Sequence, residues 1–232
     1  MTAYDALVAV HATAGGVGLL SMLVTLVAAK GTRSHRRIGG IFAMSMAVTS
    51  ATGLLVALIL SAFPEVARPT ASEAALQQLR VAGVFFAVIS LVTGQAIAFG
   101  VLAPRARSHS PHRHPLSRTI NALLAAASLG ALVLGIPSMH PYLLVAGGLG
   151  LVNAVRASRD EPQSSWLRTH VQAMLGGCTA ATTAFTVQTV SRLSPESLVA
   201  ALAWTVPVAL GMFATAVWTR RLRTRKMVLD AG

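Results

Sequence analysis

Three ionisable side chains stand inside stretches that are otherwise apolar, and they are the residues of this sequence most able to do chemistry. His11, Arg80 and His170 each lie a few residues inside a long apolar run. An ionisable group inside a membrane span is costly, so its default interpretation is functional. The competing interpretation of Arg80 is an anchor that reaches water, and that of each histidine is a neutral imidazole bonded to a helix carbonyl.

The histidines suggest a redox site of haem or quinone type. A b-type haem in a helical bundle takes axial imidazoles from two helices at similar depth. His11 and His170 lie near opposite ends of their spans, about 14 Å apart along the membrane normal, so each needs a local partner. The candidate partner is His140 on the outer side and His35 on the inner side, although both are expected in loops. The predicted cofactor-binding residues are therefore His11, His35, His140 and His170, with haem b or a small apolar, quinone-like molecule as the ligand.

Other chemistries lack their residues. Cys178 is the single cysteine, which excludes an intrachain disulfide, a four-thiolate metal site and c-type haem attachment. The sequence has no G-x-S-x-G, H-E-x-x-H or P-loop motif. None of its seven carboxylates lies deep in an apolar run. This weakens the hypothesis of a proton-coupled transporter, because such proteins usually move protons through carboxylates inside the membrane. The run His109–His114 carries arginine and no carboxylate, so we expect a basic loop rather than a metal site.

The composition is that of a membrane protein. The 232 residues are 54% hydrophobic and 11% charged, with a mean hydropathy of +0.64, whereas soluble domains carry about 25% charge. Crossing the hydrocarbon takes about 20 apolar residues in a helix. Seven stretches meet that need, and they lie at about 4–29, 38–62, 76–103, 119–137, 141–157, 166–191 and 197–219. The sequence thus predicts an all-α, polytopic bundle of about seven helices in a single domain over 1–232.

The basic residues predict an orientation. The net charge is +12, and 16 of the 19 lysines and arginines fall on alternate loops and the C-terminal tail. The remaining three are Arg68, Arg80 and Arg192. By the positive-inside rule the N-terminus lies outside and the C-terminus is cytoplasmic. The cations then face anionic lipid head groups on the cytoplasmic side, so no nucleic-acid partner is needed to explain them.

Small and polar residues mark the inward face of the first helix. One stripe at helical spacing contains His11, Gly15, Gly18, Met22 and Thr25. Helices in lipid associate through close packing of small residues and hydrogen bonds between helices. We therefore expect this stripe, His11 included, to face a neighbouring helix.

Three segments resemble a family of bacterial polytopic membrane proteins whose function is not assigned. The first is His11-(x)3-Gly15 followed by KGTRSHRRIG at 30–39, and the second is WLRTH at 166–170 with Met174. The third is the C-terminal Trp218-Thr219-Arg220-Arg221. The resemblance implies about seven helices in the bacterial cytoplasmic membrane and a focus on His11, His35 and His170. It supplies no reaction.

The leading functional hypothesis is an integral membrane protein with a histidine-based haem- or quinone-type redox site. The alternative is a small-molecule transporter or a structural membrane component in which the same histidines only bond helices together. The lipid bilayer is the expected partner, and the sequence is also compatible with a homo-oligomer. Whether the chain is an enzyme is not decided by its sequence.

Overall fold

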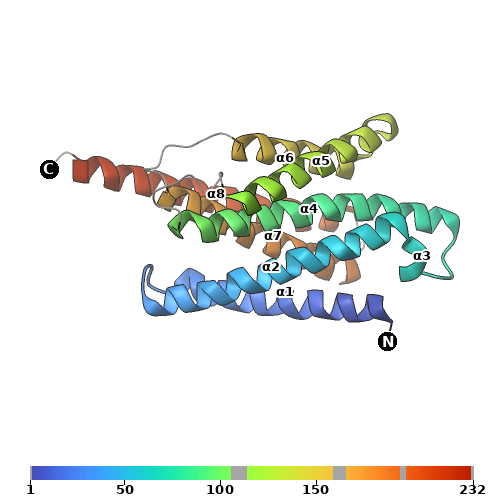
Figure 1. Cartoon of the computed structure of the whole chain (residues 1–232), viewed down its shortest axis with the longest axis horizontal. Coiled ribbons are helices and arrows are strands. Elements are labelled where there is room, and N and C mark those ends of the chain that lie inside the picture. Colours follow the sequence, from blue (N-terminus) through green and yellow to red (C-terminus); the bar gives the residue numbers. More distant parts are fainter. Residues whose placement is uncertain (1, 106–113, 159–165, 194–196, 231–232) are drawn as a thin grey trace. The chain divides into compact units, whose positions relative to one another are not determined.

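The protein is a set of helices joined by short connections (Figure 1). The computed structural model describes residues 2–105, 114–158, 166–193 and 197–230, and over these residues it contains helices and no strand. The helices are α1 (Ala3–Val27), α2 (Arg33–Ala62), α3 (Pro64–Ala67), α4 (Glu73–Arg105), α5 (Pro115–Ser138), α6 (Pro141–Ala157), α7 (Trp166–Leu193) and α8 (Ser197–Asp230). The all-α fold class is confirmed.

Seven of these helices correspond to the seven expected spans. By length and composition, α1, α2, α4, α5 and residues Leu202–Leu222 of α8 can each cross a membrane. Helix α6 has 17 residues, which makes it the shortest apolar helix of this set, as the sequence predicts. Helix α7 has 28 residues, but it is not among the helices apolar enough to cross a membrane by this measure. Threonines, Arg168 and His170 lower its mean hydropathy. Five such helices make the chain a membrane protein.

Several helix boundaries differ from the expected ones for local reasons. Helix α2 begins at Arg33 because the side chain of Thr32 accepts a hydrogen bond from the backbone N–H of His35 at 3.2 Å and caps the helix. His35 therefore lies in the first turn of α2 rather than in a loop, which corrects the expectation. Helix α8 continues past 219 to Asp230, and the short helix α3 was not expected.

A tight turn joins α5 to α6, as the prolines at 137 and 141 predict. Met139 has a φ of 48°, the left-handed conformation that commonly ends a helix. The backbone N–H of His140 then donates to the carbonyl of Gly135 at 3.0 Å. This turn places His140 at the N-cap of α6.

The chain divides into two compact units. Unit 1 comprises Met1–Gln95 and His112–Asp160, and unit 2 comprises Ala96–Pro111 and Glu161–Gly232. Helix α4 contributes residues to both, with the division after Gln95. Unit 1 thus contains α1 to α3, most of α4, and α5 with α6, whereas unit 2 contains the end of α4 with α7 and α8.

In unit 1, helix α4 contacts both helical hairpins. A hydrogen bond from Ser50 Oγ to the carbonyl of Ser90 joins α2 to α4 at 2.6 Å. On another side of α4, a Cβ at Gly150 of α6 would lie 2.9 Å from Val88. Val88 itself is fully buried. Unit 1 is therefore built around α4, with the α1–α2 pair and the α5–α6 pair packed against it.

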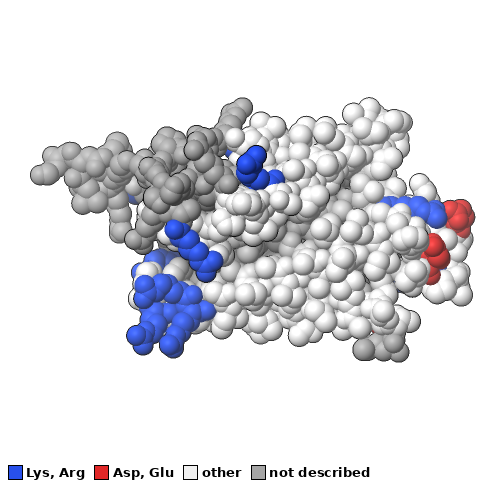
Figure 2. Space-filling model, in the orientation of Figure 1, with Lys and Arg blue, Asp and Glu red and all other residues white. Residues whose placement is uncertain are grey.

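On the face shown in Figure 2, charged residues gather at two opposite ends of unit 1. One end carries the cations of the α1–α2 connection and the start of α2, which are Lys30, Arg33, Arg36 and Arg37. At the opposite end, Arg80 Nη1 pairs with Glu73 Oε1 at 2.7 Å. Both partners lie in the first turns of α4, which agrees with the interpretation of Arg80 as an anchor near water.

Candidate functional site

His11 lies where α1, α2 and α4 meet. Its Nδ1 is 3.0 Å from the carbonyl oxygen of Thr49 and 3.3 Å from Thr52 Oγ1. A Cβ at Gly53 would lie 3.0 Å from His11 Cε1 and 2.9 Å from Ser90 Oγ. Gly53 therefore makes room for the imidazole on one side and for α4 on the other. We call His11, Thr49, Thr52, Gly53 and Ser90 the His11 junction.

The predicted stripe of α1 does face a neighbouring helix. A Cβ at Gly15 would lie 3.8 Å from Thr49, and a Cβ at Gly18 would lie 2.9 Å from Met46 Sδ, both in α2. A Cβ at Gly39 of α2 would lie 3.6 Å from Thr25 of α1. The stripe that contains His11 thus lies along the α1–α2 contact, as the sequence predicts.

His170 lies in unit 2, in the second turn of α7. Its Nδ1 is 2.6 Å from the carbonyl oxygen of Gly100 in α4. One turn further along α7, Met174 packs over the same glycine, where a Cβ would lie 2.8 Å from Met174 Cε. We call His170, Met174, Gly100 and Pro104 the His170 junction, because Pro104 determines which donors the Gly100 carbonyl can have.

The two junctions hold their imidazoles in the same tautomer. A carbonyl oxygen only accepts hydrogen bonds, so Nδ1 must carry the proton in both His11 and His170. In the neutral ring Nε2 then carries the lone pair. Among the described residues no hydrogen bond to Nε2 of either ring is seen. Both histidines thus carry their lone pair on Nε2.

This arrangement selects among ligands. An imidazole whose Nδ1–H is bonded to a backbone carbonyl is oriented as metal-ligating histidines usually are. The same lone pair accepts a hydrogen bond from a hydroxyl, such as that of a quinol, whereas a quinone carbonyl would need a protonated ring. Each histidine would supply one nitrogen ligand to a haem iron or one hydrogen-bond acceptor to a quinol hydroxyl. Among the described residues no cluster of three or more histidine, cysteine or carboxylate side chains lies close enough to hold a metal ion.

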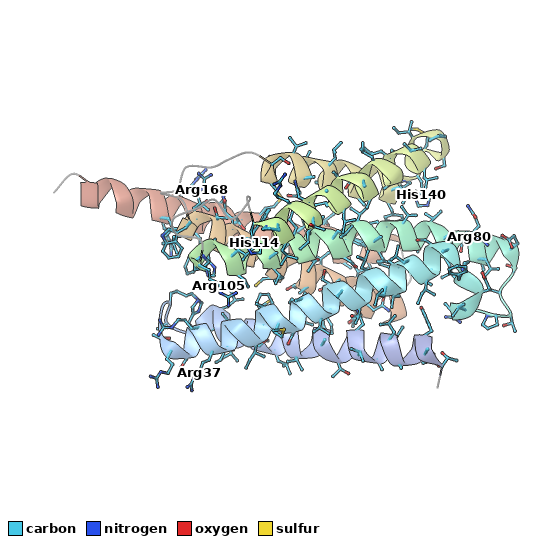
Figure 3. The ribbon with its side chains drawn as sticks, viewed as in Figure 1. Arg37, Arg80, Arg105, His114, His140 and Arg168 are labelled. Carbon is cyan, nitrogen blue, oxygen red and sulfur yellow. The ribbon has the colours of Figure 1, made fainter. Side chains whose placement is uncertain are left out.

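The proposed partner histidines lie in other surroundings. His140 lies at the same end of unit 1 as Arg80 and opposite Arg37 (Figure 3). Its ring packs against Tyr142 with the ring centroids 5.9 Å apart, and its buried Nδ1 has no hydrogen-bond partner among the described residues. The contacts seen for His11 run to α2 rather than to this turn. The half-buried His35 belongs to unit 1, whereas His170 belongs to unit 2.

A polar chain that was not predicted from the sequence crosses three helices of unit 1. Gln95 Nε2 of α4 donates to Asn121 Oδ1 of α5 at 2.6 Å. Asn121 Nδ2 donates in turn to the carbonyl of Ala154 at 3.1 Å and to Ser158 Oγ at 2.9 Å, both at the end of α6. Gln95 is buried. The signal was available, because an amide side chain inside an apolar span needs a partner from another helix.

Gly100 and Pro104 were not predicted to belong to a site either. A proline lacks the N–H that would bond to the carbonyl four residues earlier, so Pro104 leaves the Gly100 carbonyl in need of another donor. His170 is that donor.

Comparisons of this chain with protein-family models, with curated proteins and with solved structures gave no match.

Proposed function

We propose that this protein is an integral component of the bacterial cytoplasmic membrane in which His11 and His170 bind a redox-active ligand of haem or quinone type. The observation that supports this proposal is the shared geometry of the two junctions. In each, the carbonyl of a neighbouring helix fixes the Nδ1–H tautomer and leaves the Nε2 lone pair for a ligand. A haem bound at either junction would supply one-electron chemistry, and the imidazole of that junction would orient it and tune its potential.

The test is whether the protein as isolated from its membrane carries such a ligand. Full-length protein purified in mild detergent is expected to show a Soret absorption band or to release a quinone on solvent extraction. His11→Ala and His170→Ala should each lower the ligand content, since each removes one Nε2. His114→Ala is the matched control, because that exposed ring caps α5 through the N–H of Leu116 and lies outside both junctions. Wild-type protein that holds neither iron nor quinone would overturn the proposal.

A structural role of the same histidines is the second candidate. It is favoured by the His170 junction, where the imidazole completes the hydrogen bonding of a carbonyl that Pro104 leaves without a helix donor. In this case, His170→Ala destabilises a protein that carries no ligand. Ligand analysis of the wild-type protein therefore separates the two candidates, because only the redox function requires a bound group.

The orientation belongs to the same proposal. We place the cationic end of unit 1 at the cytoplasmic side, where Arg33, Arg36 and Arg37 face anionic lipid head groups. Lys30 has a further contact, since its Nζ donates to the carbonyls of Thr25 at 2.9 Å and Leu26 at 2.8 Å. It therefore caps α1 as well as adding charge.

Labelling of single cysteines tests this orientation. In a Cys178→Ser background, Ala3→Cys should react with an impermeant thiol reagent from outside intact spheroplasts, and Ser34→Cys should react only after lysis. Both positions are exposed, so each is its partner's control. The opposite pattern would reverse the orientation.

The motifs at 30–39 and 166–170 support membership of the bacterial family described above, whose function is not assigned, as a part of this proposal.

A further inference from the structure

Pro104 lies in the last turn of α4, four residues after Gly100. In an α-helix the carbonyl of residue 100 would accept a hydrogen bond from the N–H of residue 104. Proline has no N–H, so that bond is absent whatever the surroundings. A carbonyl placed among apolar helices without a donor is destabilising, so this position needs a partner from elsewhere.

His170 meets that demand at short range. The distance from Nδ1 to the Gly100 oxygen is 2.6 Å, shorter than the corresponding 3.0 Å from His11 to Thr49. Gly100 is buried and has no side chain to keep α7 away from its carbonyl. Met174 occupies the space beside it, with Cγ and Sδ each 3.0 Å from the place of a Cβ.

The carbonyl at the His11 junction has no such need. Thr49 lies inside α2, where the N–H of Gly53 follows four residues later and can close the normal helix bond. The hydroxyl of Thr52 also lies 3.2 Å from the same oxygen. The short contact in unit 2 is thus explained by Pro104 and not by a general preference of histidine for helix carbonyls.

We infer that Pro104 and Gly100 are positioning residues for His170: Pro104 reserves the Gly100 carbonyl for the imidazole, and this carbonyl fixes the Nδ1–H tautomer and presents Nε2 to a ligand. Gly100 supplies the acceptor carbonyl and, because it has no side chain, lets the imidazole approach it. Pro104 leaves that carbonyl without its helix donor. The inference deepens the proposed function, on which it rests for the use of Nε2, but the tautomer itself needs no ligand. It can therefore be tested even if the protein binds neither haem nor quinone.

The experiment reads the tautomer directly in the full chain. Protein labelled with ¹⁵N-histidine in detergent micelles gives separate nitrogen shifts for protonated and unprotonated ring positions. In the wild type, His170 is expected as the Nδ1–H tautomer. Pro104→Ala restores an N–H that competes for the Gly100 carbonyl, so the ratio of the two tautomers should move about fivefold toward Nε2–H, the equivalent of one ordinary hydrogen bond.

A second proline serves as the matched control. Pro137 lies in the last turn of α5 in unit 1, where the carbonyl four residues earlier belongs to the exposed Val133. Pro137→Ala should leave the tautomer of His170 unchanged. An Nε2–H tautomer in the wild type, an unchanged ratio in Pro104→Ala, or an equal change in Pro137→Ala would each overturn the inference. The wild-type spectrum is decisive alone if the alanine variant fails to fold.

A protein with no bound ligand but with the expected tautomer shift would end the proposed redox function and leave this inference standing. A protein that binds haem or quinone through His170, but shows no tautomer shift in Pro104→Ala once the ligand has been removed, would do the reverse. The two failures are therefore distinguishable in one set of samples.

Discussion

Units 1 and 2 each use a histidine to join two helices, but the acceptors differ. The Thr49 carbonyl of unit 1 lies in an uninterrupted helix and has the Thr52 hydroxyl at 3.2 Å. The Gly100 carbonyl of unit 2 has lost its helix donor to Pro104, and the His170 ring takes its place at 2.6 Å. The same side chain therefore adds one bond among several in unit 1 and completes an otherwise unfilled acceptor in unit 2.

The units also differ in what limits the approach of their helices. A Cβ at Gly83 of α4 would lie 2.6 Å from the backbone nitrogen of Ser61 and 2.7 Å from the carbonyl oxygen of Ala57, both of α2. In unit 2, a Cβ at Gly211 of α8 would collide with the side chain of Thr179 in α7. At Gly83, unit 1 brings backbone against backbone, whereas at Gly211, unit 2 brings backbone against a side chain that can adjust.

The largest expected effect is at Gly83. Gly83→Ala must push α2 and α4 apart, because neither backbone atom can rotate away, and should destabilise unit 1 by about 3 kcal/mol or more. Gly211→Ala should cost less, about 1–3 kcal/mol, since Thr179 can turn at the expense of its 2.8 Å bond to the Leu175 carbonyl. Unfolding in mixed detergent micelles, followed by far-UV circular dichroism, measures both.

Two glycines with open space beside them provide the controls for this pair. A Cβ at Gly16 in unit 1 or at Gly176 in unit 2 would have no neighbouring atom within 4 Å. Alanine at either position should therefore be neutral or stabilising by up to about 1 kcal/mol. Equal losses in Gly83→Ala and Gly211→Ala would contradict the distinction between the backbone and side-chain contacts.

The second expected effect separates the histidines. His170→Ala leaves the Gly100 carbonyl without a donor and should destabilise unit 2 by about 2 kcal/mol. His11→Ala removes one of several bonds and should cost about 0.6 kcal/mol, the average for a hydrogen bond between membrane helices. The tryptophans make the readout specific, because Trp166, Trp204 and Trp218 all belong to unit 2. Fluorescence should therefore report the loss in His170→Ala, whereas far-UV circular dichroism measures the loss in His11→Ala. A larger loss in His11→Ala than in His170→Ala would reverse the comparison.

Sequence reasoning reached the helices and the α1 stripe but not the acceptors of the histidines. Hydropathy identifies a span because the whole segment must suit lipid, and the spacing of His11, Gly15 and Gly18 follows from the helical period alone. Which carbonyl a histidine meets depends instead on how two helices pack. Pro104 was the one local signal, since a proline indicates a carbonyl in need of a donor four residues earlier.

Helix ends were less predictable than helix middles. The early start of α2 depends on Thr32 as an N-cap, which hydropathy does not weigh, and this cap is what moves His35 from a loop into a helix. Gln95 and Asn121 were not predicted because they carry no charge and so do not stand out in an apolar run as an ionisable residue does. These neutral amides cost less in lipid than a charge does, yet they bond three helices together.

The third expected effect concerns this amide chain, which has no counterpart among the described contacts of unit 2. Gln95→Ala and Asn121→Ala should show a coupling of about 0.6–1.7 kcal/mol in a double-mutant cycle. Asn121→Ala should be the more damaging single change, because its amide also bonds to Ala154 and Ser158 at the end of α6. Circular dichroism of the four proteins measures the coupling, and additive losses would show that the 2.6 Å bond contributes nothing of its own.

The smallest expected effect tests the redundancy at the His11 junction itself. Thr52→Val keeps the shape of the side chain and removes a hydroxyl that lies 2.7 Å from the Val48 oxygen, 3.2 Å from the Thr49 oxygen and 3.3 Å from His11 Nδ1. Its single proton is shared between the two carbonyls. If His11 is one donor among several, Thr52→Val should lower the free energy of unfolding by about 0.5 kcal/mol or less. His11→Ala should then cost more in the Thr52→Val background than in the wild type, because the Thr49 carbonyl has only its helix bond left. Far-UV unfolding curves of the four proteins give both numbers. A cost of His11→Ala that is the same in both backgrounds would mean that the hydroxyl does not share this acceptor, and the contrast with the single donor at Gly100 would then rest on the helix bond of Gly53 alone.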